Sequence, residues 1–213
     1  MWQSAPCSGA STVTWAIVMA VGGRAERLDS DRDTLVNVSA LGDPVPSARF
    51  MGGREYELVL AGQPTEPTPD DVAQVLADKL MLLPAVEPHT GPFRGQQMRW
   101  TGPEPAFGSG QRAAALSFYL AMMTDTCLGL TGAAGPTVVE GPFARNPEFR
   151  GMLAAATGRP VLASDASTGT AIGAALLFAG KHAAVPTPPI ASRDAPAVWR
   201  AYAERWRDRC MSD

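Results

Sequence analysis

The fold is decided by residues 136–158, which read PTVVEGPFARNPEFRGMLAAATG. The β-branched run at 137–139 predicts a short buried strand, and Glu140, Gly141 and Pro142 interrupt it. Asn146 directly before Pro147 is typical of a helix start, because asparagine caps free N–H groups and proline suits the first helical position. Apolar residues then recur at helical spacing up to a glycine stop: Phe149, Met152, Leu153, Ala156 and Gly158. The stretch predicts a strand, a tight turn and a helix, an arrangement that brings backbone N–H groups close to a ligand.

The α/β unit continues further along the chain. Residues 159–164 (RPVLAS) predict a second strand, and residues 168–178 (TGTAIGAALLF) predict a second helix that is rich in small residues. Strand, helix, strand and helix in succession favour an α/β layer with right-handed crossovers. From spacing alone, a ligand site and a plain βαβ unit without one are about equally supported.

Residues 140–146 (EGPFARN), 157–161 (TGRPV) and 168–177 (TGTAIGAALL) resemble the C-terminal domain of the FGGY carbohydrate kinases. These are ATP-dependent sugar kinases of the actin-like ATPase superfamily, and the resemblance runs from Ser11 to Gly180. It implies a ribonuclease H-like, actin-like ATPase fold: an α/β domain with a mixed five-stranded sheet and helices on both faces. We expect one domain over residues 1–213, with 1–10 irregular and 194–211 a terminal helix.

The resemblance also implies a nucleotide site. In the family, a Gly-Gly-x-x-x-Asn-like turn holds the adenosine side of ATP, and a Gly-Ala-Ala helix closes that lobe. The matching residues are Gly141, Pro142 and Asn146 for the turn, and Gly173, Ala174 and Ala175 for the helix. Pro142 departs from the second glycine, which restricts the backbone and removes one N–H donor.

Residues 11–15 (STVTW) resemble a Ser-Thr-Gly-Thr-Trp hairpin turn that faces the ATP phosphates in the family. Ser11, Thr12, Thr14 and Trp15 match, whereas Val13 replaces the glycine. A β-branched residue resists positive φ and crowds an approaching phosphate. Without the resemblance, the hydroxyls of Ser11 and Thr12 would be ordinary groups at a strand edge. Residues 11–21 as a whole predict a strand or one strand of a hairpin.

Residues 49–60 (RFMGGREYELVL) fit the same family. Gly52 and Gly53 would let the backbone approach a base or ribose, and Glu55 could accept a hydrogen bond from a hydroxyl. The pattern alone favours, by about two to one, a simple turn ahead of an amphipathic helix.

The remaining segments are assigned from local signals. Residues 34–38 predict a strand, 39–47 a loop, 83–110 a long loop, and 111–130 a buried helix that is apolar nearly all round. Thr68 caps a further helix, with Asp71 in the capping-box position. Adjacent Asp70 and Asp71 point in different directions at that start and do not indicate acid–base chemistry. Asp194 is the expected cap of the last helix, whose apolar side comprises Val198, Trp199, Tyr202 and Trp206.

The composition of the chain argues against several classes of function. The net charge is -3 and the 18 Lys and Arg residues are scattered, so neither nucleic acid nor an anionic membrane is expected as a partner. Three widely spaced cysteines (Cys7, Cys127 and Cys210) favour a reduced, cytoplasmic protein. Two histidines, His89 and His182, support neither a zinc site nor a histidine triad. No apolar run suggests a membrane span, and no basic region precedes an N-terminal apolar segment as in a signal peptide.

The resemblance implies phosphoryl transfer from ATP to a hydroxyl of a sugar or polyol, with Mg²⁺ carried by the nucleotide. In the family, the N-terminal lobe holds most of the sugar site and the aspartate base; no residue here matches that base, so we assign no catalytic residue and no metal ligand. The chain is expected to bind ATP or ADP, to meet a sugar only together with an N-terminal lobe, and to be inactive alone. The alternative is a non-catalytic interaction domain derived from a sugar kinase, which could form a homodimer.

Overall fold

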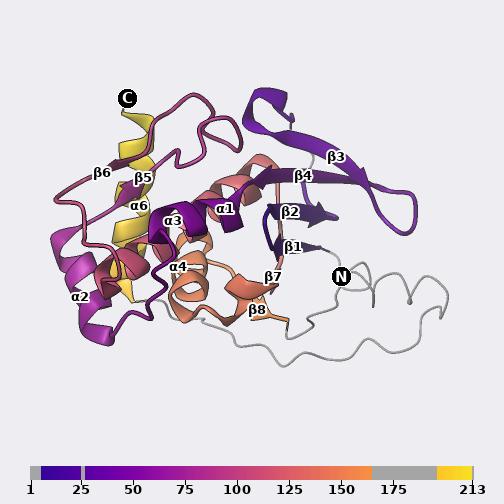
Figure 1. Cartoon of the computed structure of the whole chain (residues 1–213). Coiled ribbons are helices and arrows are strands. Elements are labelled where there is room, and N and C mark those ends of the chain that lie inside the picture. The colour runs from indigo at the N-terminus through magenta and orange to yellow at the C-terminus, as the bar shows by residue number, and fades with distance from the viewer. Residues whose placement is uncertain (1–5, 25–26, 165–195, 213) are drawn as a thin grey trace.

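The computed structural model describes residues 6–24, 27–164 and 196–212. Its main sheet has six strands in the order β3-β4-β2-β1-β7-β8, and the described helices lie together on one side of it (Figure 1). The strands are β1 (Cys7–Thr12), β2 (Ala16–Val21), β3 (Thr34–Val38), β4 (Pro44–Phe50), β7 (Thr137–Glu140) and β8 (Val161–Ala163). The helix expected at 168–178, with Gly173, Ala174 and Ala175, lies outside the described residues.

The strand directions determine where the chain turns. β1 runs antiparallel to β2 and parallel to β7, and β7 runs parallel to β8. β4 is antiparallel to both β2 and β3. β1, β4, β7 and β8 therefore share one direction, and their carboxyl ends meet at the same edge of the sheet.

Two local assignments were wrong, and the main sheet has six strands rather than the five that the resemblance implies. The first strand begins at Cys7, so residues 7–10 are not irregular, and residues 11–21 contain the end of β1, a turn and the whole of β2. Residues 44–47 belong to β4 instead of a loop. Pro44 and Pro46 are tolerated there because they pair only with β3, while pairing with β2 starts at Ser47.

The helices follow their predicted signals closely. They are α1 (Gly52–Leu60), α2 (Pro69–Asp78), α3 (Gly110–Leu130), α4 (Pro147–Thr157) and α6 (Ala197–Met211), with short 3-10 turns η2 (Ser30–Arg32) and η3 (Pro142–Arg145). The capping box of Thr68 and Asp71 at α2 is confirmed. At α4, Asn146 caps the first turn and Gly158 takes a left-handed conformation at the end, as predicted.

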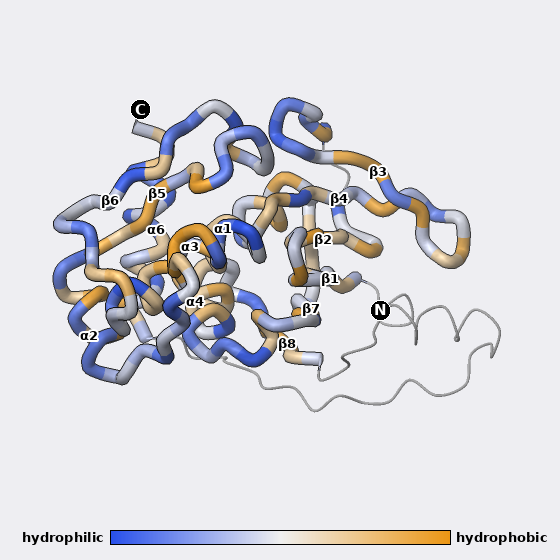
Figure 2. Tube along the Cα trace, viewed as in Figure 1, coloured by the Kyte–Doolittle hydropathy of each residue, from blue (hydrophilic) through white to orange (hydrophobic). Residues whose placement is uncertain are grey.

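α3 is the centre of the core, and most of its length is coloured as hydrophobic in Figure 2. It packs against α4, α2, α1 and the sheet, and side chains on all its sides are buried, Leu116, Phe118, Met122 and Met123 among them. Its length and apolar composition are sufficient for a membrane span, which the sequence analysis missed. Because 78% of the relevant stretch is buried inside the protein, we describe α3 as a core helix.

The long segment after α2 is tied to the rest of the domain at two places. It carries a small second sheet of β5 (Leu82–Leu83) and β6 (Arg99–Trp100). Buried Asp33 accepts a 2.8 Å hydrogen bond from the backbone N–H of Gly91 and forms a 3.2 Å ion pair with Arg94. The predicted loop is therefore held against the start of β3.

α6 closes the core from the far end of the chain. The Tyr202 hydroxyl donates to the Leu80 carbonyl, and the Trp206 indole N–H donates to the Leu82 carbonyl, both at 2.8 Å. Val198 was wrongly placed on the buried side, since it is 50% exposed. Pro196 occupies the cap position of α6, and Asp194 lies outside the described residues.

Candidate functional site

Three turns meet at the carboxyl edge of the sheet. The first is the hairpin turn (residues 13–15) after β1, the second is the start of α1 after β4, and the third is η3 after β7. In open α/β sheets, ligands bind outside the carboxyl ends of the strands. The fold thus brings all three sequence-predicted segments to one place, although they are far apart in the chain.

The hairpin turn and the start of α1 are in direct contact. The Gly53 N–H donates a 3.1 Å hydrogen bond to the Thr14 carbonyl. A β-carbon at Gly53 would overlap the Val13 carbonyl, and one at Gly52 would press on the ring of Phe50 at 3.0 Å. Gly53 is needed here because the two backbones approach so closely, whereas Gly52 makes room for neighbouring side chains.

The hairpin turn also contacts η3. The Thr12 hydroxyl donates a 2.6 Å hydrogen bond to the Glu140 carbonyl and accepts one of 3.3 Å from the Phe143 N–H. Gly141 has φ of 87°, and a β-carbon there would overlap the Thr12 carbonyl. Thr12 is completely buried, so any part it has in holding a nucleotide is indirect.

The accessible groups of this site are few. Thr14 and Pro142 are exposed, Ser11 is half-buried, and Val13 has 65% of its surface exposed at the tip of the hairpin turn. Val13 is not among the described non-glycine residues with positive φ, which are Asp33, Ala61 and Lys79. The expected backbone conflict at Val13 is therefore absent, and only its side-chain bulk differs from the glycine of the family.

The turn at 141–146 differs from expectation in its N–H groups. Pro142 is the first residue of η3 and has no N–H, Phe143 donates to Thr12, and Ala144 donates to the Gly141 carbonyl at 3.0 Å. The free backbone donors predicted at this turn are therefore used inside the protein. Pro142 and Arg145 are the exposed residues of η3.

Both polar atoms of the Asn146 side-chain amide form hydrogen bonds within the protein. Its Oδ1 accepts a 2.8 Å hydrogen bond from the Phe149 N–H as the cap of α4, and its Nδ2 donates to the Ser117 hydroxyl at 2.9 Å. The side chain links the turn to α3 and fixes its position.

Glu55 does not reach the surface of the site. Its side chain is fully buried, Oε1 accepts a 3.3 Å hydrogen bond from the Glu87 N–H, and Oε2 has no partner among the described residues. Burial raises the pKa of Glu55 to about 7, although the Glu87 N–H and the Tyr119 hydroxyl act in the opposite direction. The role suggested for it, accepting a hydroxyl of the ligand, is not supported, because the carboxyl group faces the core.

Arg49 is a positioning residue that the sequence analysis did not identify. Its guanidinium lies 4.8 Å from the ring centre of Trp15, the last residue of the hairpin turn. The alternation of β4 could have suggested it, since Arg49 is exposed and Ala48 and Phe50 beside it are buried.

Comparison with known proteins decides the family. Residues 4–187 match the model of the carbohydrate kinase FGGY, C-terminal domain. The chain belongs to the FGGY carbohydrate kinases. A solved carbohydrate kinase from Novosphingobium aromaticivorans is 30% identical with a TM-score of 0.81, and the match covers 97% of this chain and 46% of that one. This chain thus spans about half the length of the solved FGGY relative.

More distant solved structures share the fold. Xylulose kinase from Bifidobacterium adolescentis matches with a TM-score of 0.62 at 18% identity, over 95% of this chain and 44% of that one. Plasmodium falciparum glycerol kinase, solved with ADP, matches with a TM-score of 0.55 at 13% identity, over 80% of this chain and 37% of that one. A comparison with curated protein sequences gives no match.

Among the described residues, no group of three or more His, Cys, Asp or Glu side chains could hold a metal ion. The exposed hydroxyl of Thr14 and the three adjoining backbone turns suit contact with a phosphate chain.

Proposed function

We propose that this chain is the nucleotide-binding lobe of an ATP-dependent sugar kinase, acting in carbohydrate metabolism in the cytoplasm. The observation that carries the proposal is the meeting of the hairpin turn, the start of α1 and η3 at the carboxyl edge of the sheet, in a member of the FGGY family. ATP, when bound, supplies the phosphoryl group and brings Mg²⁺ with it.

The residues divide into those that would hold the nucleotide and those that shape the site. Ser11 and Thr14 would present hydroxyls to the phosphates, and Gly141 and Pro142 would lie beside the adenosine. Thr12, Gly52, Gly53 and Asn146 fix the three turns relative to one another through their contacts within the protein. Phosphoryl transfer requires the γ-phosphate, the metal and the acceptor to be positioned together. The sugar and the base would come from a second lobe, so we propose that these residues alone bind nucleotide without phosphorylating a sugar.

Calorimetry with MgATP and MgADP tests the proposal. We expect saturable binding with a Kd of about 1 mM or tighter. Thr14→Val should weaken binding several-fold, because it removes an exposed hydroxyl while keeping the shape of the side chain. Val38→Thr is the matched control: it makes the reverse change at an exposed residue of β3 and should leave binding unchanged. The absence of nucleotide binding at millimolar ligand would contradict the proposal. Phosphorylation of a sugar by this chain alone would contradict the part of the proposal that requires a second lobe.

One observation favours the alternative of an interaction domain. β3 is one of the two edge strands of the described sheet, and it carries exposed Val36 and Val38 next to exposed Leu41 in the following turn. An apolar edge strand can pair with another chain. Under this alternative, analytical ultracentrifugation should show a concentration-dependent dimer that Val36→Lys or Val38→Lys abolishes, and MgATP should not bind.

A further inference from the structure

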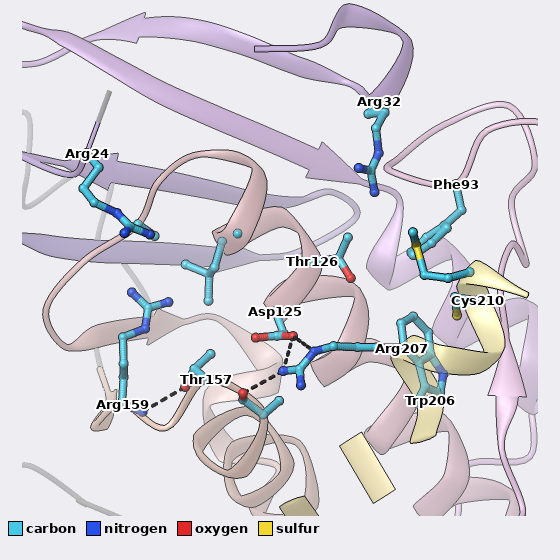
Figure 3. Close-up of a pocket in the computed structure, with 15 residues that line it drawn as sticks. Arg24, Arg32, Phe93, Asp125, Thr126, Thr157, Arg159, Trp206, Arg207 and Cys210 are labelled. Atoms are coloured by element: carbon cyan, nitrogen blue, oxygen red, sulfur yellow. Dashed lines mark hydrogen bonds and ion pairs between the residues drawn. The ribbon is translucent and has the colours of Figure 1, made fainter. Parts of the chain in front are cut away.

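A pocket of about 590 Å³ lies beside the carboxyl ends of α3, α4 and α6, and Arg24 and Arg159 line one side of it (Figure 3). Arg24 follows β2, which runs against β1, and Arg159 precedes β8, which runs with β1. Both residues therefore belong to the amino edge of the parallel strands. The volume falls within the range of small-molecule sites.

Four arginines line this pocket: Arg24, Arg32, Arg159 and Arg207. Arg207 pairs with Asp125 at 2.8 Å and also donates to the Ala156 carbonyl at 2.7 Å. Arg32 donates to the Pro92 carbonyl at 3.1 Å. Within the described part of the chain, Arg24 and Arg159 form no ion pair, and Figure 3 shows their side chains extending toward one another.

The pocket has a surplus of positive charge even when the partial negative charges of the helix carboxyl ends are included. α3, α4 and α6 all end beside the pocket, and each helix carboxyl end is equivalent to about half a negative charge. Four guanidinium groups set against the Asp125 carboxylate and three such helix ends leave a surplus of about one and a half positive charges. That is close to the charge of a phosphate monoester at neutral pH.

Arg159 adds a second, independent sign of an absent partner. Its Nη1 is inaccessible to solvent and has no hydrogen-bond partner among the described residues. A buried donor without a partner is costly, and such groups are rare in native structures. Burial also lowers the pKa of Arg159, with Asp125 acting in the opposite direction. The rest of the side chain is partly accessible, and an anion in the pocket would pair with that part of the guanidinium and offset the cost of its partial burial.

The rest of the lining is largely apolar. Phe93, Leu128, Ala133, Trp206 and Met211 form walls beside the arginines. A bare inorganic ion would leave these walls in contact with water. A molecule with an anionic head and an apolar or aromatic body would cover them and gain from their burial.

We propose that this pocket binds a small phosphate-bearing organic molecule, with its phosphate between Arg24 and Arg159 and its body against the apolar walls. The site is separate from the nucleotide turns and does not depend on the proposed kinase function. Arg24 and Arg159 lie at the edge of the sheet opposite the three turns, which suits a ligand that acts on the domain without competing for the nucleotide.

Calorimetric or NMR titration of the whole chain with phenyl phosphate tests the proposal. We expect saturable one-to-one binding, weaker binding of inorganic phosphate, and no binding of benzyl alcohol, which has the ring without the charge. The double variant Arg24→Gln and Arg159→Gln should weaken phenyl phosphate binding at least about tenfold, since each arginine would lose a charge-assisted contact. Arg159→Lys should fall between the wild type and the double variant, because lysine keeps the charge and loses the fork of donors.

Arg205→Gln is the matched control. Arg205 is an exposed arginine on α6 that does not line this pocket, so it removes the same charge elsewhere and should change binding less than about twofold. MgATP titrations of the double variant separate the two sites, because its nucleotide affinity should equal that of the wild type. Equal phenyl phosphate binding by the wild type and the double variant would overturn the proposal, as would the absence of binding by the wild type. Thermal unfolding of each variant verifies that the fold is retained.

Discussion

The hydroxyl of Thr12 donates a hydrogen bond of 2.6 Å to the carbonyl of Glu140, 128 residues later in the chain. The same oxygen accepts a hydrogen bond from the Phe143 N–H, so one buried side chain connects the end of β1 with the turn after β7. The position of the candidate site depends on this connection more than on any exposed group.

Replacing Thr12 with valine should destabilise the protein and separate these two turns. The change keeps the side-chain shape and leaves the buried Glu140 carbonyl and Phe143 N–H without a partner, which costs about 1–3 kcal/mol. Urea unfolding measures the loss. Thr12→Ser keeps the hydroxyl and should retain most of the stability; equal losses for both variants would show that the methyl group matters and the hydrogen bonds do not.

Replacing Gly53 with alanine should damage the site through backbone contact alone. The new β-carbon would overlap the Val13 carbonyl, while φ of Gly53 lies in the range open to any residue. We expect a loss of more than about 1 kcal/mol and weaker MgATP binding, because the hairpin turn must move away from α1. Gly129→Ala in α3 meets no atom within 4 Å and should instead raise stability by up to about 1 kcal/mol. Gly53→Ala with unchanged stability would mean that the turns are not tightly packed.

Buried Glu55 should make the stability depend on pH. Its folded-state pKa of about 7 lies above the ordinary value of 4.5, so the folded state binds the proton more tightly than the unfolded state. This stabilisation is complete below the ordinary value and is lost as the pH rises to the folded-state value. Between pH 6 and pH 8, the free energy of unfolding should fall by about 1 kcal/mol more in the wild type than in Glu55→Gln. Parallel curves for the two proteins would contradict the assignment.

Restoring the family's glycines should strengthen nucleotide binding. Val13→Gly removes an exposed side chain from the tip of the hairpin turn, and Pro142→Gly returns an N–H donor to η3. Calorimetry should give a lower Kd for MgATP in the double variant than in the wild type. Unchanged affinity would favour the interaction domain, in which these residues do not contact a nucleotide.

Local signals were sufficient for much of the fold. The β-branched run at 137–139, the Asn146-Pro147 start and Gly158 gave β7, α4 and the end of α4 correctly. The β1–β2 hairpin was only partly anticipated, because its turn at 13–15 contains no Gly, Asn or Asp to mark it. β4 was partly missed because two prolines in a strand normally argue for a loop, and only the pairing pattern shows why they are tolerated.

The three segments of the candidate site were picked out from the sequence, and the fold brings them together, but the contacts between them were not predicted. Gly53 and Gly141 were singled out for contact with a nucleotide, and in the structure their missing β-carbons make room for the protein's own backbone at Val13 and Thr12. Contacts of this kind join segments separated by many residues, and neither spacing nor propensity encodes which segments meet. The arginines of the pocket in Figure 3 were seen only as scattered charges, because they come together only once the strands are paired.

The hydrogen bonds that Tyr202 and Trp206 donate to backbone carbonyls at and just before β5 have a consequence for synthesis on the ribosome. α6 is the last described helix to leave the exit tunnel, and until it arrives the interior beside β5 stays open to water. The segments synthesised earlier therefore cannot complete the core until α6 has been synthesised and packs beside β5. A nascent chain arrested before residue 196 should remain sensitive to protease, while one released in full should resist it.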